Sequence, residues 1–200
     1  MIVYVESNFV LELAYLRDEQ ESCEEILALA QAQKVQLVLP AFSVGEPYES
    51  WVRRSKQRAE LLDKLTAEIK ELARSKPYAD SAQEFHEITN ALRRSAGEEK
   101  RRLDDAMNRV LESALVAPIG RDTLRSAIDL QRTRNLSPQD SIVYASVLSH
   151  VKTASEEPKC FLTKNSKDFA NPDVYNDLTR YDCKLLTSFK SGLGFVQARM

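Results

Sequence analysis

Four segments of this chain carry an acidic or amide side chain directly after an apolar run or at the start of a helix. Glu6 follows the first apolar run, Glu46 lies near an expected helix start, and Asp140 opens another helix. Asn165 and Asp168 follow a later apolar run. Carboxylates gathered from separate elements repel one another, so their convergence requires a cation. These hard oxygen ligands have no His or Cys nearby, which favours Mg²⁺ or Mn²⁺ over zinc. Such an ion permits metal-assisted hydrolysis of a phosphodiester bond.

Each of these residues also has an ordinary structural explanation. Glu6 could cap the helix that follows it, and Asp140 lies in a first helical turn, where a negative charge suits the helix dipole. Glu46 could be a solvated surface acid, and Asn165 and Asp168 could be turn residues. Taken singly, each of these explanations is a serious alternative. Taken together, the order and context of the residues favour a shared site.

The elements that must position these side chains are strands that alternate with helices. Short apolar runs predict strands at residues 2–5, 35–39, 115–117, 159–163 and 183–186. Apolar residues at helical spacing predict helices between them, and Ser137 is the expected N-cap of the one that carries Asp140. This alternation predicts an α/β fold with one mainly parallel sheet and helices on both faces. Glu6 then lies at the carboxyl end of its strand, where ligands bind in open α/β sheets.

A long, polar, helical segment separates the second expected strand from the third. The pattern of residues 51–113 predicts two antiparallel helices with facing apolar stripes, which are interrupted at Pro77. Asp80 or Ser81 could cap the second helix. We therefore expect residues 1–200 to form a single domain with this helical hairpin as an insertion within it.

Basic residues cluster twice within the expected insertion, at 53–58 and at 100–102. Both clusters could contact phosphates. Acidic residues lie beside each cluster, however, which favours a solvated, ion-paired helix surface. Tyr48 and Trp51, close to Glu46, could stack on a nucleic-acid base, although core packing is the simpler explanation.

Composition places further limits on function. The 200 residues carry a formal net charge of -2, so any contact with nucleic acid must come from a local basic face. The three cysteines are an odd number without metal-like spacing, which suits reduced thiols in the cytoplasm. We expect no signal peptide, because no positive region precedes the first short apolar run, which ends at Glu6. We expect no membrane partner, because no apolar run approaches membrane length. No Gly-rich phosphate loop supports a nucleotide-binding enzyme.

Four short segments resemble the motifs of one known family, the PIN-domain proteins. Residues 5–8 (Val-Glu-Ser-Asn) resemble the family's opening Asp-x-Asn motif, and residues 41–46 resemble the segment that carries its second acid. Residues 137–145 resemble the third motif, in which an acid opens a buried helix. Residues 161–169 are similar to the fourth, a strand followed by Thr-x-Asn/Asp-x-x-x-Phe. Each motif is short, but all four occur in the family's order.

The resemblance implies a three-layer α/β/α fold and a metal-dependent endoribonuclease that uses Mg²⁺ or Mn²⁺, which in many members is a toxin paired with an antitoxin. The resemblance implies three catalytic residues, Glu6, Glu46 and Asp140. It implies four metal ligands, Glu6, Asp140, Asn165 and Asp168. It also implies that Asn8, Thr163, Asn165 and Asp168 contact the substrate or support the ligands. The expected partners are RNA, an antitoxin protein and a second copy of the chain. The expected location is the cytoplasm.

Two features depart from the family's pattern. Glu6 stands where the family usually has Asp, and its extra methylene adds about 1.5 Å of bond length. The insertion at 51–113 is also far longer than in compact toxins. One alternative is therefore a catalytically weakened PIN-like module that binds RNA or a protein through its helical arm. Another is a phosphatase or other phosphoryl hydrolase that uses the same acids.

Overall fold

The structure, a computed structural model, describes the backbone of the whole chain and the side chains of residues 1–78, 85 and 87–200. The expected capping role of Asp80 or Ser81 therefore lies outside the described side chains. All three cysteines are free and buried in the core. Burial raises the pKa of each of these thiols, so they are packing residues rather than reactive ones. Among the described residues, no helix is long and apolar enough to cross a membrane.

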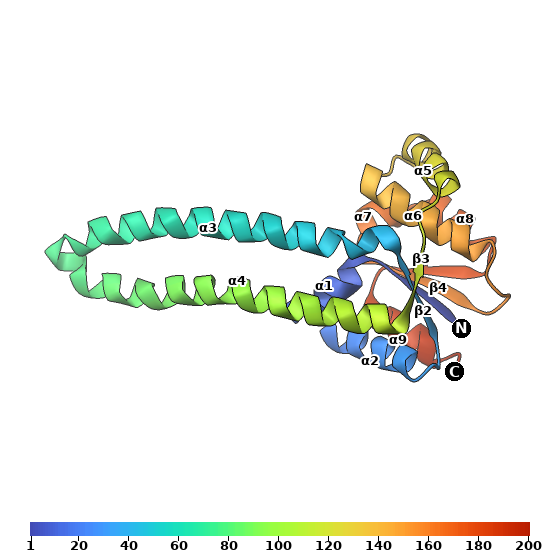
Figure 1. Cartoon of the computed structure of the whole chain (residues 1–200), viewed down its shortest axis with the longest axis horizontal. Helices are drawn as coiled ribbons and strands as arrows, with labels where there is room; N and C mark the ends of the chain where they lie inside the picture. Colours follow the sequence, from blue (N-terminus) through green and yellow to red (C-terminus); the bar gives the residue numbers. More distant parts are fainter.

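Five strands form one parallel sheet in the order β3-β2-β1-β4-β5 (Figure 1). They are β1 (Ile2–Val5), β2 (Gln36–Pro40), β3 (Ala114–Ala117), β4 (Lys159–Leu162) and β5 (Cys183–Leu186). In the centre of the sheet, Val3 of β1 pairs with Leu37 on one side and Cys160 on the other. The predicted parallel sheet is confirmed.

Helices cover both faces of this sheet (Figure 1). In chain order, they are α1 (Ser7–Tyr15), α2 (Gln20–Gln31), the 3-10 turn η1 (Ala41–Val44), α3 (Glu46–Ala73), the 3-10 turn η2 (Lys76–Tyr78), α4 (Ala79–Ser113), α5 (Arg121–Arg134), α6 (Pro138–Val151), α7 (Ser166–Phe169), α8 (Pro172–Thr179) and α9 (Phe189–Gln197). Side chains of a strand point alternately to the two faces, so β1 contributes to two cores. Val3 and Val5 pack with α1, α2, α9 and the end of α4, whereas Ile2 and Tyr4 pack with α5, α6 and α8. This is the expected three-layer α/β/α arrangement.

The helices α3 and α4 pack against each other and project from the sheet as a long hairpin (Figure 1). Position 51, the expected start of the insertion, falls inside α3, which begins at Glu46. The helix tolerates Pro47 because a proline in the first turn needs no N–H partner. The other helix of the arm ends at Ser113, and β3 begins at the next residue. The arm is therefore a direct continuation of the domain at both of its ends.

Polar contacts hold the two helices of the arm together near the domain. Arg58 donates to Glu99 at 2.9 Å and to Ser95 at 2.9 Å, and Trp51 Nε1 donates to the carbonyl of Ala96 at 3.2 Å. Lys100 Nζ lies 5.7 Å from the centroid of the Trp51 ring. Trp51 is also packed against the core of the domain. These contacts indicate that Trp51 packs the arm against the domain rather than stacking on a base.

The order of the strands defines where a ligand would bind. The chain passes from β1 to β2 and β3 on one side, and then returns to place β4 on the other side of β1. A crevice forms at the carboxyl ends of strands where the strand order reverses in this way. Glu6 follows β1 directly, and Thr163 and Asn165 follow β4. The fold thus brings two of the sequence motifs to its topological switch point.

Candidate active site

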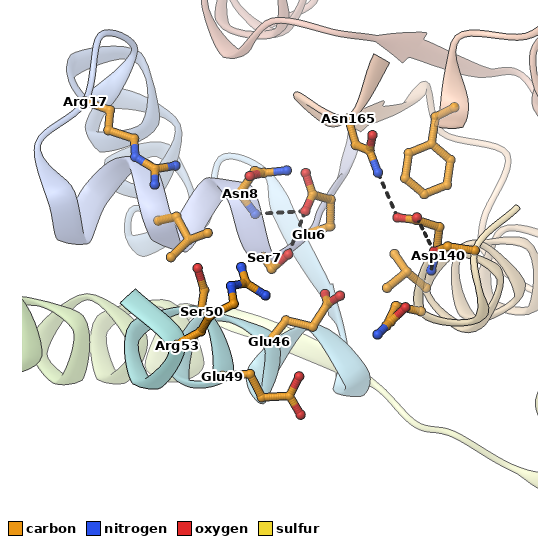
Figure 2. A pocket seen from close by; sticks show the side chains of 15 residues that line it. Glu6, Ser7, Asn8, Arg17, Glu46, Glu49, Ser50, Arg53, Asp140 and Asn165 are labelled. Carbon is orange, nitrogen blue, oxygen red and sulfur yellow. Dashed lines mark hydrogen bonds between the residues drawn. The ribbon is translucent and has the colours of Figure 1, made fainter. Parts of the chain in front are cut away.

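A polar cavity of about 430 Å³ opens at the carboxyl ends of β1 and β4, among residues of α1, α3 and α6. Glu6, Glu46, Asp140 and Asn165 all line it, although they come from four different segments (Figure 2). Asp168 does not line this cavity but a neighbouring hollow beside α8. The structure thus brings together three carboxylates and one amide, and it leaves the fifth residue outside.

Glu6 is fixed by the start of α1. Its Oε2 accepts hydrogen bonds from the backbone N–H of Asn8 at 2.8 Å and from the Ser7 hydroxyl at 2.9 Å, so it is the N-cap of the helix. Its Oε1 is buried and accepts no hydrogen bond from the described residues. Thr163 lies close enough to favour the charged form of Glu6 without meeting hydrogen-bond geometry. A buried carboxylate oxygen without a donor favours either a proton or a nearby cation.

The electrostatics of the cavity favour protonation of its acids in the absence of a cation. Burial raises the pKa of Glu6, and hydrogen bonds from Asn8 offset this only in part. Burial also raises the pKa of Glu46 to about 7, and the charges of Glu6 and Asp140 add to that rise. Ser7 lowers the pKa of Glu46, but its one proton is already directed at Glu6, so it can serve only one of the two acids at a time.

Asp140 is oriented by two neighbours at the start of α6. Ser137 is the N-cap, Pro138 occupies the first turn, and the Ser137 hydroxyl donates to Asp140 Oδ2. Asn165 Nδ2 donates to Asp140 Oδ1 at 2.9 Å. Burial raises the pKa of Asp140, and the charge of Asp168 raises it further. The charge of Asp168 therefore affects the pKa of Asp140, although the Asp168 side chain does not line the cavity.

The two remaining predicted residues support the walls of the cavity. Thr163 is fully buried, and its hydroxyl accepts a hydrogen bond from the backbone N–H of Asn165 at 2.9 Å. Its own N–H donates to the carbonyl of Leu186 at 3.1 Å, which anchors the end of β4 to β5. Asn8 lines the cavity on α1. Thr163 thus holds the turn that presents Asn165 to Asp140.

Several residues that line the cavity were not foreseen as site residues, among them Arg17, Glu49, Ser50 and Arg53. Glu49, Ser50 and Arg53 lie three, four and seven residues after Glu46, which is the spacing of a single helix face. That spacing is visible in the sequence and could have revealed the face once Glu46 was proposed. Arg17 offers no comparable signal, because its position depends on how the chain leaves α1.

The donors of the cavity fit a divalent cation of the Mg²⁺ or Mn²⁺ type. They are hard oxygens, and Glu6 Oε1 has no partner among the described residues. Within the same part of the chain, no three acidic, His or Cys side chains are grouped closely enough to hold one ion. Mg²⁺ commonly binds through only one or two carboxylates and keeps several waters. The residues present therefore fit an ion held by one or two carboxylates together with water and substrate oxygens.

Comparison with known proteins adds one finding to this geometry. A family model described as a PIN domain matches residues 3–169. The match spans all four motifs and the helical arm between them. Neither the curated proteins nor the solved structures contain a match to this chain.

Proposed function

Since this chain belongs to the PIN-domain family, whose members are generally nucleases, we propose that it is a divalent-metal-dependent endoribonuclease acting at the cavity beside β1 and β4. One observation carries the proposal. Carboxylates from three separate elements line one cavity at the topological switch point, where burial, and to a smaller extent the charges of Glu6 and Asp140, raise the pKa of Glu46 to about 7. A fold gathers like charges in this way at a cost, which a bound cation relieves.

Glu6 and Asp140 are the residues that would hold the ion. Glu6 offers the unpartnered Oε1, and the two oxygens of Asp140 are oriented by Ser137 and Asn165. Asn165 and Asp168, which were also expected as metal ligands, would act mainly through Asp140, by a hydrogen bond and by charge. A divalent ion bound here would neutralise charge on the phosphate and activate a water for attack.

Glu46 is the residue that we propose for proton transfer. Glu46 lines the same cavity as Glu6 and Asp140, and a carboxylate placed beside the attacking water can act as its general base. Its carboxylate can accept a proton from the attacking water and return it to the leaving oxygen. Ser7, which lies between Glu6 and Glu46, can donate to either carboxylate as the proton moves.

The experiment that tests this proposal measures cleavage of a mixed RNA pool with Mn²⁺, Mg²⁺ or a chelator. Wild type should cleave only with metal, and Asp140→Asn should be at least about 100-fold slower, because it removes a charge that the site needs. Glu6→Asp should keep or raise activity. The matched control is Asp122→Asn, an exposed acid in the first turn of α5. Full activity in Asp140→Asn, or cleavage in chelator, would reject the mechanism.

A second candidate is a catalytically weakened module that binds RNA or a protein. Two observations favour it: Glu6 in place of the family's usual Asp, and the absence of a close group of three acids among the described residues. The same assay separates the two functions. Tight RNA or protein binding by wild type, with no cleavage under any metal, would select this candidate.

A narrower form of the first proposal is a toxin that acts in the cytoplasm and is neutralised by an antitoxin protein. It is supported by the family resemblance alone. Expression of the chain should then arrest growth, and co-expression of a small protein encoded beside it should restore growth. Association into a homodimer is a separate proposal, which light scattering of the purified chain would test.

A further inference from the structure

The acidic cavity continues as a cleft between α1 and α3. On α3 the cleft is lined by one helix face, which presents Glu46, Glu49, Ser50 and Arg53 in that order. On the other side it is lined by the first two turns of α1, and then by Arg17 just beyond the end of that helix. Figure 2 shows both guanidinium groups on the side of the cavity away from Asp140. The cleft therefore has an acidic end and a basic end.

Arg53 is a positively charged residue of the cavity wall. It is exposed, and it forms no ion pair with the described acids, although Glu49 precedes it by one helical turn. The two other arginines of this cluster have partners elsewhere. Arg58 is bound to Glu99, and the guanidinium of Arg54 lies 4.6 Å from the centroid of the Tyr15 ring. Arg53 alone of these three lines the cavity.

Arg17 is held in place but keeps its hydrogen-bond donors available. The preceding residue, Leu16, ends α1 in a left-handed conformation with φ of 51°, and the Arg17 N–H donates to the carbonyl of Glu12 at 3.2 Å. The guanidinium lies 5.0 Å from the centroid of the Tyr15 ring. Stacking on a ring face leaves the donors at the guanidinium edge free. No described acid forms an ion pair with Arg17.

We propose that Arg17 and Arg53 bind backbone phosphates of single-stranded RNA beside the bond that is cleaved, so that the strand runs between α1 and α3. The inference rests on the proposed function, because it takes the acidic end as the site of cleavage. Guanidinium groups bind phosphate oxygens with two parallel hydrogen bonds, which suits this role.

The spacing of the two ends suits a short stretch of one strand. Arg53 lies two helical turns after Glu46, or about 10 Å along the helix axis, which is about the length of three stacked nucleotides. A single strand is favoured over a duplex because Glu6 is only 4% exposed, so the backbone must enter the cavity to reach it. Single-stranded RNA can bend so that its backbone enters the cavity, whereas the phosphates of a rigid A-form duplex lie on a broad surface.

The test is binding of a fluorescein-labelled single-stranded RNA, followed by fluorescence anisotropy in chelator at several salt concentrations. Arg17→Gln and Arg53→Gln should each weaken binding about tenfold, and each should reduce the slope of log affinity against log salt by about 0.7. The control is Arg101→Gln, an exposed arginine of the arm that does not line the cavity. It should change affinity by less than about twofold.

The outcomes separate this inference from the proposed nuclease function. Equal losses in Arg101→Gln, unchanged binding in both site variants, or tighter binding of the same RNA annealed to its complement would overturn the inference. None of these results would affect metal-dependent cleavage by wild type, which is measured separately. Conversely, arginine-dependent binding by a wild type that never cleaves would uphold the phosphate contacts and remove the nuclease assignment.

Discussion

Replacing Glu46 by Gln should stabilise the metal-free protein at about pH 8 and leave its stability almost unchanged at about pH 4. Burial and neighbouring charges raise the pKa of Glu46 from an ordinary 4.5 to about 7. Between these values the folded protein holds a proton that the unfolded chain has already released. The free energy of unfolding of wild type therefore falls as the pH rises through this window. Glutamine has the shape of the neutral acid but does not ionise, so the free energy of unfolding of the variant should not fall in this pH window.

The magnitude follows from the shift in pKa. Each pKa unit corresponds to about 1.4 kcal/mol, so the full shift of Glu46 corresponds to about 3 kcal/mol. Glu46 is partly exposed, and screening by solvent reduces the expected gain to about 2 kcal/mol at about pH 8. At about pH 4 both the acid and the amide are neutral, so the two proteins should agree within about 0.5 kcal/mol.

Urea unfolding in chelator at both pH values would measure these free energies by linear extrapolation. The matched control is Glu49→Gln, on the same face of α3 but exposed, which should change stability by less than about 0.5 kcal/mol. Saturating Mn²⁺ should stabilise wild type at about pH 8 more than it stabilises Glu46→Gln, because binding to the folded state adds to its stability. The reasoning fails if Glu46→Gln shifts stability equally at both pH values, or if it destabilises the protein at the higher one.

Two further predictions use substitutions in α9 and α6. Gly192→Ala should lower the free energy of unfolding by about 1 kcal/mol, because the new Cβ would lie 2.6 Å from the side chain of buried Leu162. Gly194→Ala should raise the free energy of unfolding by about 0.5 to 1 kcal/mol, because its Cβ would have no atom within 4 Å and alanine favours the helix over glycine. Calorimetric melts measure both, and a common direction of change would contradict the packing argument. Ser137→Ala should cost about 1 kcal/mol through loss of the N-cap and should also weaken Mn²⁺ binding, because it removes a donor to Asp140. Titration calorimetry measures that affinity, and an unchanged value would show that Ser137 does not orient the acid.

The sheet could be predicted from the sequence because buried parallel strands are nearly continuous apolar runs. All five predicted runs agree with the strands to within one residue at each end. The order β3-β2-β1-β4-β5 could not be obtained from such runs, since every run has the same pattern. The expectation that ligands bind at the end of β1 came from the general behaviour of open α/β sheets.

The boundary of the arm was less predictable because proline has two roles. Within a helix Pro47 would break the hydrogen-bond pattern, but in a first turn it is favourable. The second role applies here, so Glu46 lies on the same continuous helix as the arm. The structure thereby links a proposed catalytic residue to the projecting hairpin, which the pattern of residues 51–113 alone did not indicate.

The basic residues show what local sequence patterns cannot resolve. The sequence around residues 53–58 favours one ion-paired surface, yet the three arginines of this cluster have different environments. Arg53 lines the cavity, Arg54 lies over Tyr15, and Arg58 is bound to the other helix of the arm. Those environments depend on how α1, α3 and α4 pack together, and only tertiary structure contains that information. The position of Asp168 depends on tertiary structure in the same way, because it lies on the short helix α7 and lines a neighbouring hollow.

The most direct test of the central claim measures Mn²⁺ occupancy and RNA cleavage in the same samples. As Mn²⁺ is added to wild type, both quantities should rise together, with protons released because Glu46 and Glu6 have raised pKa values in the metal-free protein. Asp140→Asn should lose most of the binding and the cleavage at equal concentrations while keeping its melting temperature. Cleavage that precedes occupancy, or that persists unchanged in Asp140→Asn, would contradict a metal-dependent nuclease at this cavity.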